Sequence, residues 1–280
     1  MTSADTLDDH AGPAWHKTSA LDENGRRWIA EFLRDCPWFE FYYRCALDDL
    51  ARTGLDNRFY RVGTNKAGLI LGISFDAVNI FSTVGELSED DLLSILDFDA
   101  EAELHLEAEH VGPLRAAIEA RGRLRRVSAL RYYRRAPQQD DALIDQRCLP
   151  IESQADKDAL RSFFRQHYPE TVLSDWMFDH PLLGLFEEGA LLAAAGCLVV
   201  NAELGAAHLG NFLTHPAHRG RGLGKAVGRA LIAALHAQQI RSLMLGVFEE
   251  NDHACRLYAS LGFEHLETRP LIYIDRRYLR

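Results

Sequence analysis

The stretch Leu209–Gln238, LGNFLTHPAHRGRGLGKAVGRALIAALHAQ, contains the pattern that decides the fold. An apolar run reaches Thr214, Pro216 ends it, and a glycine-rich turn, Arg219–Gly224, follows directly. After the turn, apolar residues recur at intervals of three and four, as in an amphipathic helix: Leu223, Ala226, Val227, Ala230, Leu231, Ala234 and Leu235. The stretch therefore predicts a strand, a turn with little side-chain bulk and a helix in direct succession.

Such a turn is suited to binding an anion, because the first N–H groups of a helix have no partner and lie at the positive end of its dipole. Arg219, Arg221 and Lys225 add positive charge. Two other phosphate-binding patterns do not fit. The spacing is R-x-x-G-x-G, not the dinucleotide pattern G-x-G-x-x-G, and Ala226 stands where a P-loop needs a hydroxyl. Taken alone, the turn is also compatible with a glycine-rich turn that carries ordinary surface arginines.

A second motif, Asn251–Phe263, follows the next predicted strand and reads NDHACRLYASLGF. Asn251 or Asp252 is suited to begin a helix and Gly262 to end it. Asn251 and Tyr258 are seven residues apart and so lie two turns apart on one helix face. That face is placed to run along a ligand, while the alternative for Tyr258 is an ordinary core aromatic.

In this order and at this separation, Thr214–Gly224 and Asn251–Phe263 resemble the motifs of the GNAT superfamily of acyl-CoA-dependent N-acyltransferases. The resemblance covers roughly Pro150–Ile274. It implies that acetyl-CoA is the co-substrate, that its pyrophosphate lies on the turn and that Tyr258 stands beside the thioester sulfur. The coenzyme-binding residues implied by the resemblance are Leu213, Thr214, Arg219, Gly220, Arg221, Gly222, Leu223, Gly224, Lys225, Asn251 and Tyr258.

The fold class predicted for the whole chain is α+β, with two GNAT-like lobes that each have a mixed, mostly antiparallel sheet flanked by helices. Residues 1–20 are predicted to be a flexible leader, and residues 136–147 a linker rich in polar residues. The N-terminal lobe, 21–135, lacks the glycine turn and resembles a degenerate GNAT-like lobe by its order of elements. The C-terminal lobe, 148–280, carries the coenzyme-binding strand, turn and helix.

Hydrophobic periodicity and capping residues predict the individual elements. The helices are expected at residues 23–35, 43–53, from Ser88, 113–120, 154–167, 174–179, 222–238 and 251–261. The strands are expected at residues 58–63, 68–74, 77–83, 103–108, 124–134, 148–151, 182–186, 190–200, 205–214, 242–247 and 264–274. The basic run Arg121–Arg135 is interpreted as one solvated face of a strand.

Acyl transfer to an amine needs a neutral nucleophile. At pH 7, deprotonation of a lysine-like amine costs about 4–5 kcal/mol of free energy. Glu249 is the predicted catalytic base, and Tyr258 the group that protonates the departing thiolate. A backbone N–H near Leu213 is expected to stabilise charge on the carbonyl oxygen. Other candidate bases are Glu203, His208 and His215, and weaker candidates for holding a cationic amine are Asp175, Asp179 and His180.

Composition limits the function classes. The 280 residues carry a formal charge of −10, which argues against binding to nucleic acid. No apolar run is long enough to span a bilayer, and the five cysteines are scattered without a C-x-x-C pair, so we expect a cytoplasmic protein without membrane or metal partners. A monomer or homodimer is expected.

The sequence thus predicts an acetyl-CoA-dependent N-acetyltransferase that acts on a primary amine of a small molecule or an amino acid. The alternatives are a non-catalytic module that responds to acetyl-CoA, transfer of a longer acyl chain, transfer to a hydroxyl, and transfer to a protein amine. A scaffold that binds no coenzyme is the remaining possibility.

Overall fold

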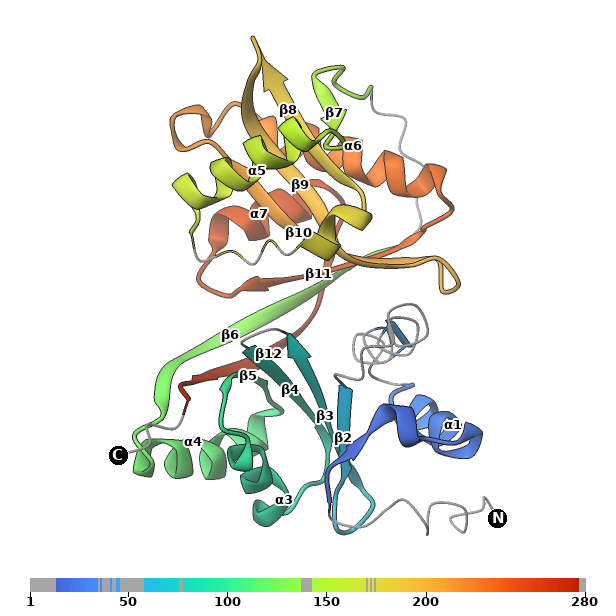
Figure 1. Ribbon diagram of the computed structural model, residues 1–280, viewed down its shortest axis with the longest axis vertical. Helices are drawn as coiled ribbons and strands as arrows, with labels where there is room; N and C mark the ends of the chain where they lie inside the picture. The colour runs from blue at the N-terminus through green and yellow to red at the C-terminus, as the bar shows by residue number, and fades with distance from the viewer. Residues whose placement is uncertain are drawn as a thin grey trace. The chain divides into compact units, whose positions relative to one another are not determined.

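Twelve strands form a mixed, mostly antiparallel sheet in the computed structural model, and six α-helices accompany them among the described residues (Figure 1). The described residues are 14–34, 36, 41, 44–45, 58–75, 78–136, 143–169, 171, 173 and 175–276. The strands are hydrogen-bonded in the order β1-β2-β3-β4-β5-β12-β6-β11-β10-β9-β8-β7. The predicted α+β class with a mixed, mostly antiparallel sheet is confirmed.

The chain divides into two compact units, and unit 1 is built from two separate segments of the chain. Unit 1 comprises Met1–Leu130 and Thr268–Arg280, and unit 2 comprises Arg131–Glu267. Strand β6 therefore begins in unit 1 and ends in unit 2, and β12 does the reverse. The predicted domain boundary differs, because a linker at residues 136–147 places the whole of β6 in the N-terminal lobe and the whole of β12 in the C-terminal lobe.

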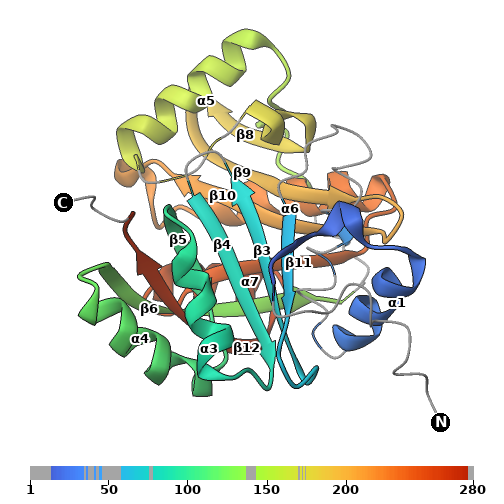
Figure 2. The ribbon, with the colours of Figure 1, turned by 60° about the horizontal axis from the view of Figure 1, so that its bottom comes forward.

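Unit 1 contains a sheet with one parallel pair, β4 with β5, among antiparallel neighbours. Its strands are β1 (His16–Lys17), β2 (Arg58–Val62), β3 (Gly68–Phe75), β4 (Val78–Gly85), β5 (Glu101–His105), the first part of β6 (Leu124–Arg135) and the last part of β12 (Glu264–Ile274). Its described helices are α1 (Glu23–Phe32), α3 (Glu89–Leu93) and α4 (Val111–Ala120). Helices α3 and α4 pack on one face of the strands through Leu92, Leu114 and Ile118 (Figure 2).

The start of α3 shows how the sequence sets a helix boundary in unit 1. Ser88 and Asp91 form a capping box, as the predicted N-cap requires. The Asp91 carboxylate is fully buried and also accepts hydrogen bonds from Arg61 and Thr64. These bonds outweigh the effect of burial and lower the pKa of Asp91.

In unit 2, β10 and β11 form a parallel pair, while β7, β8, β9 and β10 pair in antiparallel fashion. Its strands are β7 (Cys148–Pro150), β8 (Leu182–Glu187), β9 (Ala190–Asn201), β10 (Ala206–Thr214), β11 (Ser242–Phe248), the end of β6 and the start of β12. Its helices are α5 (Gln154–His167), α6 (Leu223–Ala237) and α7 (Asp252–Ser260).

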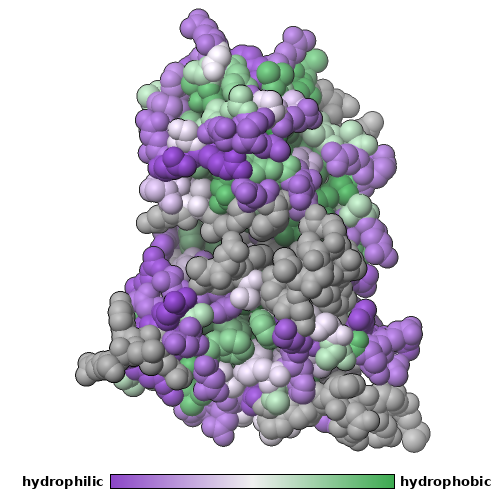
Figure 3. Space-filling model, in the orientation of Figure 1, coloured by the Kyte–Doolittle hydropathy of each residue, from purple (hydrophilic) through white to green (hydrophobic). Residues whose placement is uncertain are grey.

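Helices cover both faces of the unit 2 sheet, because side chains of a strand alternate between its faces. Ala193 and Ala195 of β9 join the core beneath α6 and α7, whereas Ala194 joins the core beneath α5. The solvent-facing side of α5 is hydrophilic (Figure 3). No described helix has both the length and the apolar character needed to cross a membrane.

Most predicted elements of unit 2 are confirmed within one residue at each end, including the three helices. The prediction of a flexible leader is wrong for its last residues. His16–Lys17 pairs with β2, and the Trp15 ring packs against Phe98 with ring centroids 4.9 Å apart. The predicted helix 43–53 falls outside the described residues except for positions 44–45.

The interpretation of the basic run as a solvated face holds for Arg121, Arg125, Arg126 and Arg134, which are exposed, but it is wrong for two other arginines. Arg123 and Arg135 are only 2% and 1% exposed. The Arg123 guanidinium donates to four backbone carbonyl oxygens, so its burial is compensated by hydrogen bonds; these belong to Leu96, Phe98, Ala100 and Asp275.

Candidate functional site

Strands β10 and β11 part after a short parallel ladder. The ladder consists of Ala206–Ser242, Ala207–Leu243 and His208–Met244, whereas β10 continues to Thr214 and β11 to Phe248. The outer part of β10 also carries a bulge, since its register with β9 shifts between Gly210 and Leu213. Asn211, inside this bulge, has a left-handed backbone with φ 55°. The last part of β10 is therefore irregular, and its edge on the β11 side extends beyond the ladder between the two strands.

The turn between β10 and α6 has two glycines in the left-handed conformation, Gly220 with φ 76° and Gly222 with φ 77°. A Cβ atom added at either position would meet nothing within 4 Å. Both glycines are therefore required by the backbone, and the space beside them is open. The loop matches the turn expected from the sequence.

The first turn of α6 presents N–H groups without an intrahelical acceptor. Ala226 donates the first intrahelical bond, to the Gly222 carbonyl, and no side chain caps the helix. Gly224 has a different role from the other glycines, because an added Cβ would lie 3.1 Å from Thr214 Oγ1. Gly224 thus lets α6 approach the end of β10, while Gly220 and Gly222 shape the open turn.

Cations surround this turn, and one of them already has an anionic partner. Arg221 Nη2 lies 3.3 Å from an oxygen of Glu187, and its Nη1 lies 2.6 Å from His218 Nδ1. Arg219 Nε donates to the Thr214 carbonyl at 3.4 Å. Within the described residues, Lys225 makes no ion pair. Two of the three cationic side chains predicted around the turn, Arg219 and Arg221, thus make polar contacts within the protein.

A pocket of about 330 Å³ adjoins the start of α6. Lys225 and Arg229, one helical turn apart, contribute two positive charges to its wall. The other lining residues are Leu143, Ile144, Asp145, Gly222 and Ala226. The pocket therefore extends the positively charged turn along the helix.

Tyr258 lies on α7 and is 7% exposed. Its ring packs edge-on against Phe212 of β10, with centroids 5.3 Å apart, and contacts the rings of Tyr133 and Phe263 at 6.4 and 6.1 Å. Burial raises the pKa of Tyr258 well above its usual value, with smaller effects from Cys255 and Tyr168. Its hydroxyl group is therefore protonated throughout the neutral range.

The sequence profile described as the Acetyltransferase (GNAT) family matches residues 151–263, which span the open turn and α7. This segment is a GNAT acetyltransferase domain. The family depends on an acyl-CoA donor, and the match confirms the resemblance drawn from the two motifs.

Solved structures extend the similarity beyond this GNAT domain. A Drosophila protein of 14% identity has a TM-score of 0.67, with 94% of this chain and 99% of that chain covered. A GCN5-related N-acetyltransferase from Sphaerobacter thermophilus, also 14% identical, has a TM-score of 0.56 over 82% of this chain and 84% of its own. A fungal multi-domain GH3 beta-N-acetylglucosaminidase that contains a GCN5-related glucosamine N-acetyltransferase region, 11% identical, has a TM-score of 0.55 over 94% of this chain and 38% of its own.

At these identities the likeness shows the fold alone, and it includes unit 1 as well as the GNAT domain. No curated protein sequence matches this chain significantly.

Two predicted residues of the GNAT domain are engaged in contacts with other side chains or with the backbone. Glu249, in the turn before α7, forms an ion pair with Arg131 at 3.0 Å. Asn251 Oδ1 accepts the Ala254 N–H at 3.1 Å and so caps α7, as the sequence indicated. Leu213 lies in β10 and Leu223 is buried in the core, so only their backbones are available to a ligand.

The alternative bases are distributed along β10. Glu203 is in the turn before β10, at the opposite end from Thr214. His208 is buried in the ladder, and burial lowers its pKa to about 3. His215 follows the end of β10, where its Nδ1 accepts the Ala217 N–H, and burial followed by the nearby imidazoles lowers its pKa.

The acidic residues predicted to hold a cationic amine lie in the segment before β8. Asp175 and Asp179 lie in one 3-10 helix, and Asp175 forms an ion pair with Arg161 at 2.6 Å. His180 follows, and its backbone N–H bonds to Met177.

Arg131 and Tyr133 are functional candidates that the sequence did not reveal. They contact Glu249, Cys255 and Tyr258 from more than a hundred residues away. The alternation of basic and apolar residues in Arg121–Arg135 predicted a strand there, but it did not indicate what Arg131 and Tyr133 contact.

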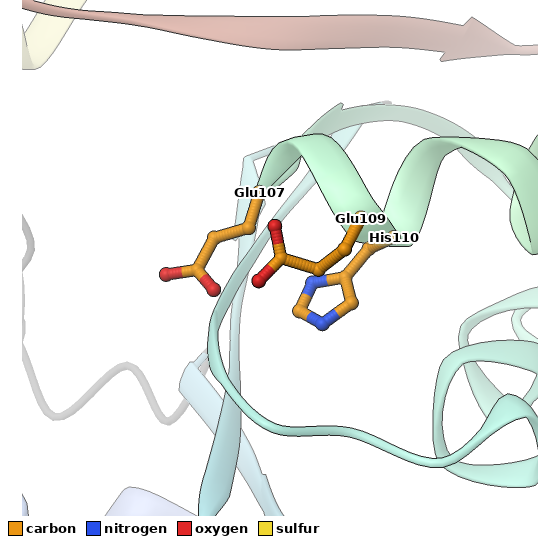
Figure 4. Close-up of side chains that lie close together, drawn as sticks. All are labelled: Glu107, Glu109 and His110. Atoms are coloured by element: carbon orange, nitrogen blue, oxygen red, sulfur yellow. The ribbon is translucent and has the colours of Figure 1, made fainter.

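Three potential metal ligands of unit 1, Glu107, Glu109 and His110, lie close together at the turn between β5 and α4 (Figure 4). Glu107 accepts the Gly85 N–H at 3.2 Å, and His110 Nδ1 lies 2.9 Å from Thr83 Oγ1. Burial, the largest influence, lowers the pKa of His110. These bonds join Glu107 and His110 to β4 and so give both side chains a structural role.

Proposed function

We propose that this protein is an acetyl-CoA-dependent N-acetyltransferase that acts on a primary amine of a small molecule or an amino acid. The GNAT domain supports an acyl-CoA donor. The observation that carries the proposal is the open turn Arg219–Gly224, whose left-handed glycines leave free space beside uncapped N–H groups. A diphosphate fits such a turn, because it accepts several hydrogen bonds and carries the negative charge that the helix dipole favours.

The remainder of the coenzyme is matched by the surroundings of the turn. Lys225 and Arg229 offer positive charge in the adjoining pocket for the phosphate of the nucleotide end. The pantetheine arm has two amide groups and is suited to pair with the free edge of β10 near Leu213 and Thr214, in the manner of an added strand. Asn251, at the start of α7, is assigned to contact the same arm.

A thioester supplies an acyl group that an uncharged amine can attack, forming the amide C–N bond and breaking the C–S bond. Negative charge develops on the carbonyl oxygen, and a backbone N–H of β10 near Leu213 is assigned to stabilise it. The thiol released has a pKa near 8.5, so a proton donor aids its departure. Tyr258 is assigned this role, because its buried hydroxyl stays protonated at neutral pH.

Glu249 is assigned as the base that takes the proton of the incoming amine. Its carboxylate is half-exposed, and the ion pair with Arg131 fixes its position. A base role predicts that Glu249→Gln lowers kcat/KM much more than Arg131→Gln does. Equal losses in both variants would mean that the carboxylate serves only as an ionic partner.

A formal charge of −10 favours a cationic acceptor over an anionic one, because it concentrates cations near the protein. The rival activities are transfer of a longer acyl chain, transfer to a hydroxyl and transfer to a protein amine. A module that binds acetyl-CoA without catalysis is the rival from another class.

Release of free CoA from acetyl-CoA, measured with a thiol reagent over a panel of amines, separates these functions. We expect release that depends on an added amine and that is lost in Gly222→Glu, which places bulk and negative charge in the open turn. A sensor would bind the coenzyme without turnover. A scaffold would show no thermal stabilisation by acetyl-CoA, and either result would contradict the proposal.

A further inference from the structure

The end of β6 lies against α7, the helix that carries Tyr258. Arg131, Tyr133 and Arg135 alternate along this strand and therefore share one of its faces. Each makes a different contact with α7 or with a residue at one of its ends. None of the three falls within the matched segment 151–263.

The contact at the start of α7 is ionic. Arg131 Nη2 lies 3.0 Å from Glu249 Oε1, in the turn that leads into the helix. Its Nη1 lies 3.9 Å from Cys255 Sγ, in the first half of α7. One guanidinium thus connects the turn and the helix.

The contact in the middle is aromatic and polar. The Tyr133 ring lies against the Tyr258 ring, with centroids 6.4 Å apart, and against the ring of His265 at 5.5 Å. Burial, followed by the influence of Cys255, raises the pKa of Tyr133, whereas Arg131 acts in the opposite direction. Cys255 precedes Tyr258 by three residues, so both project from the same side of α7.

The contact at the end of α7 is a buried hydrogen bond. Arg135 Nε donates to the carbonyl oxygen of Leu261, the C-cap residue, at 2.8 Å. Arg135 is 1% exposed, and its Nη1 lies 3.5 Å from His236 of α6. A carbonyl at a helix end has no intrahelical partner, so this bond fixes where α7 ends.

We propose that β6 positions Tyr258 through Arg131, Tyr133 and Arg135, which hold α7 at its start, its middle and its end. The inference rests on the proposed role of Tyr258. These three are positioning residues, because they act on Tyr258 through the helix and do not reach the reacting atoms. All three residues lie in the part of β6 that belongs to unit 2, so acyl transfer requires a strand outside the matched segment 151–263.

Kinetics of full-length variants test the proposal with a matched control. Tyr133→Phe keeps the ring and removes the hydroxyl, and Arg131→Gln removes the charge. Arg134→Gln is the control, because Arg134 lies on the opposite, exposed side of the same strand. We expect kcat to fall about fivefold to tenfold in the first two variants, with an unchanged KM for acetyl-CoA and no change in the control.

Combination with Tyr258→Phe separates positioning from a general effect on folding. If β6 acts through the Tyr258 hydroxyl, Tyr133→Phe lowers kcat no further once that hydroxyl is absent. The same loss in both backgrounds, or full kcat in Tyr133→Phe and Arg131→Gln, would overturn the proposal.

The alkylation rate of Cys255, followed by mass spectrometry, tests the contacts without any turnover. Loosening of the strand from α7 should raise this rate at least about threefold in Tyr133→Phe, while Cys148 in β7 serves as the internal control. If Tyr258→Phe retained full kcat, the assignment of Tyr258 as the acid would be wrong. The alkylation rate of Cys255 would then be the test of whether β6 holds α7 in place. An unchanged rate for Cys255 would overturn the positioning role.

Discussion

Replacement of Gly222 by alanine separates the backbone cost of the open turn from its role in binding. Gly222 has φ 77°, and an added methyl group meets no atom within 4 Å. The substitution should therefore destabilise the free protein only through the left-handed backbone, by about 1–2 kcal/mol. For a chain of this size, this lowers Tm by roughly 2–4 °C per kcal/mol.

Binding should suffer more, because the methyl group occupies the space proposed for the diphosphate. Loss of one hydrogen bond between an N–H group and a charged oxygen costs about 1.5–3 kcal/mol. The dissociation constant of acetyl-CoA should then rise about 10- to 150-fold. Isothermal titration calorimetry gives this constant directly, and thermal unfolding without ligand gives the backbone cost.

Gly122 provides the matched control for this experiment. It also has a left-handed backbone, with φ 63°, and open space around an added methyl group, but it lies in the turn after α4 of unit 1. Gly122→Ala should lower Tm as much as Gly222→Ala and leave acetyl-CoA affinity unchanged. Equal affinity of the two variants would refute the placement of the diphosphate on this turn.

Three further predictions concern charge and burial. Because burial lowers the pKa of His208 to about 3, the unfolded chain binds a proton more readily below pH 6.5, so stability should fall by about 2 kcal/mol from pH 7 to pH 5. Urea unfolding at pH 7 and pH 5 should show a smaller fall in stability for His208→Asn than for the unchanged protein. An equal fall in the two proteins would contradict this prediction. Glu187→Gln should tighten acetyl-CoA binding about twofold to fivefold at low salt, because it frees Arg221, and the gain should shrink at high salt; a salt-independent effect would exclude this electrostatic explanation. Arg135→Met should lower the free energy of unfolding by about 2–4 kcal/mol, because it removes the buried partner of the Leu261 carbonyl, whereas Arg134→Met should change it by less than about 0.5 kcal/mol in urea titrations.

The order of elements in unit 2 was predictable because its signals are local. Ser153 and Asn251 cap helices within one turn of sequence, and the α6 pattern repeats over four turns. The open turn at Gly222 was also predictable, because glycine and proline report on a backbone of only a few residues. Such features need no knowledge of distant partners.

The features that escaped prediction depend on residues far apart in the chain. Burial of Arg135 depends on Leu261, 126 residues later, and the ion pair of Glu249 depends on Arg131. A basic residue is normally solvated, so its sequence neighbours gave no reason to place it in a core. The left-handed Asn211 similarly depends on the register of β10 with β9.

The crossing of β6 and β12 between the two units has a consequence for synthesis on the ribosome. Unit 1 needs residues 268–274, which emerge only after all of unit 2 has been translated. Until then β5 has an unpaired edge, the kind of surface that promotes aggregation in nascent chains. The half that is made first is thus the half that is finished last, and a ribosome that stalls within unit 2 leaves it open to chaperones and to proteolysis.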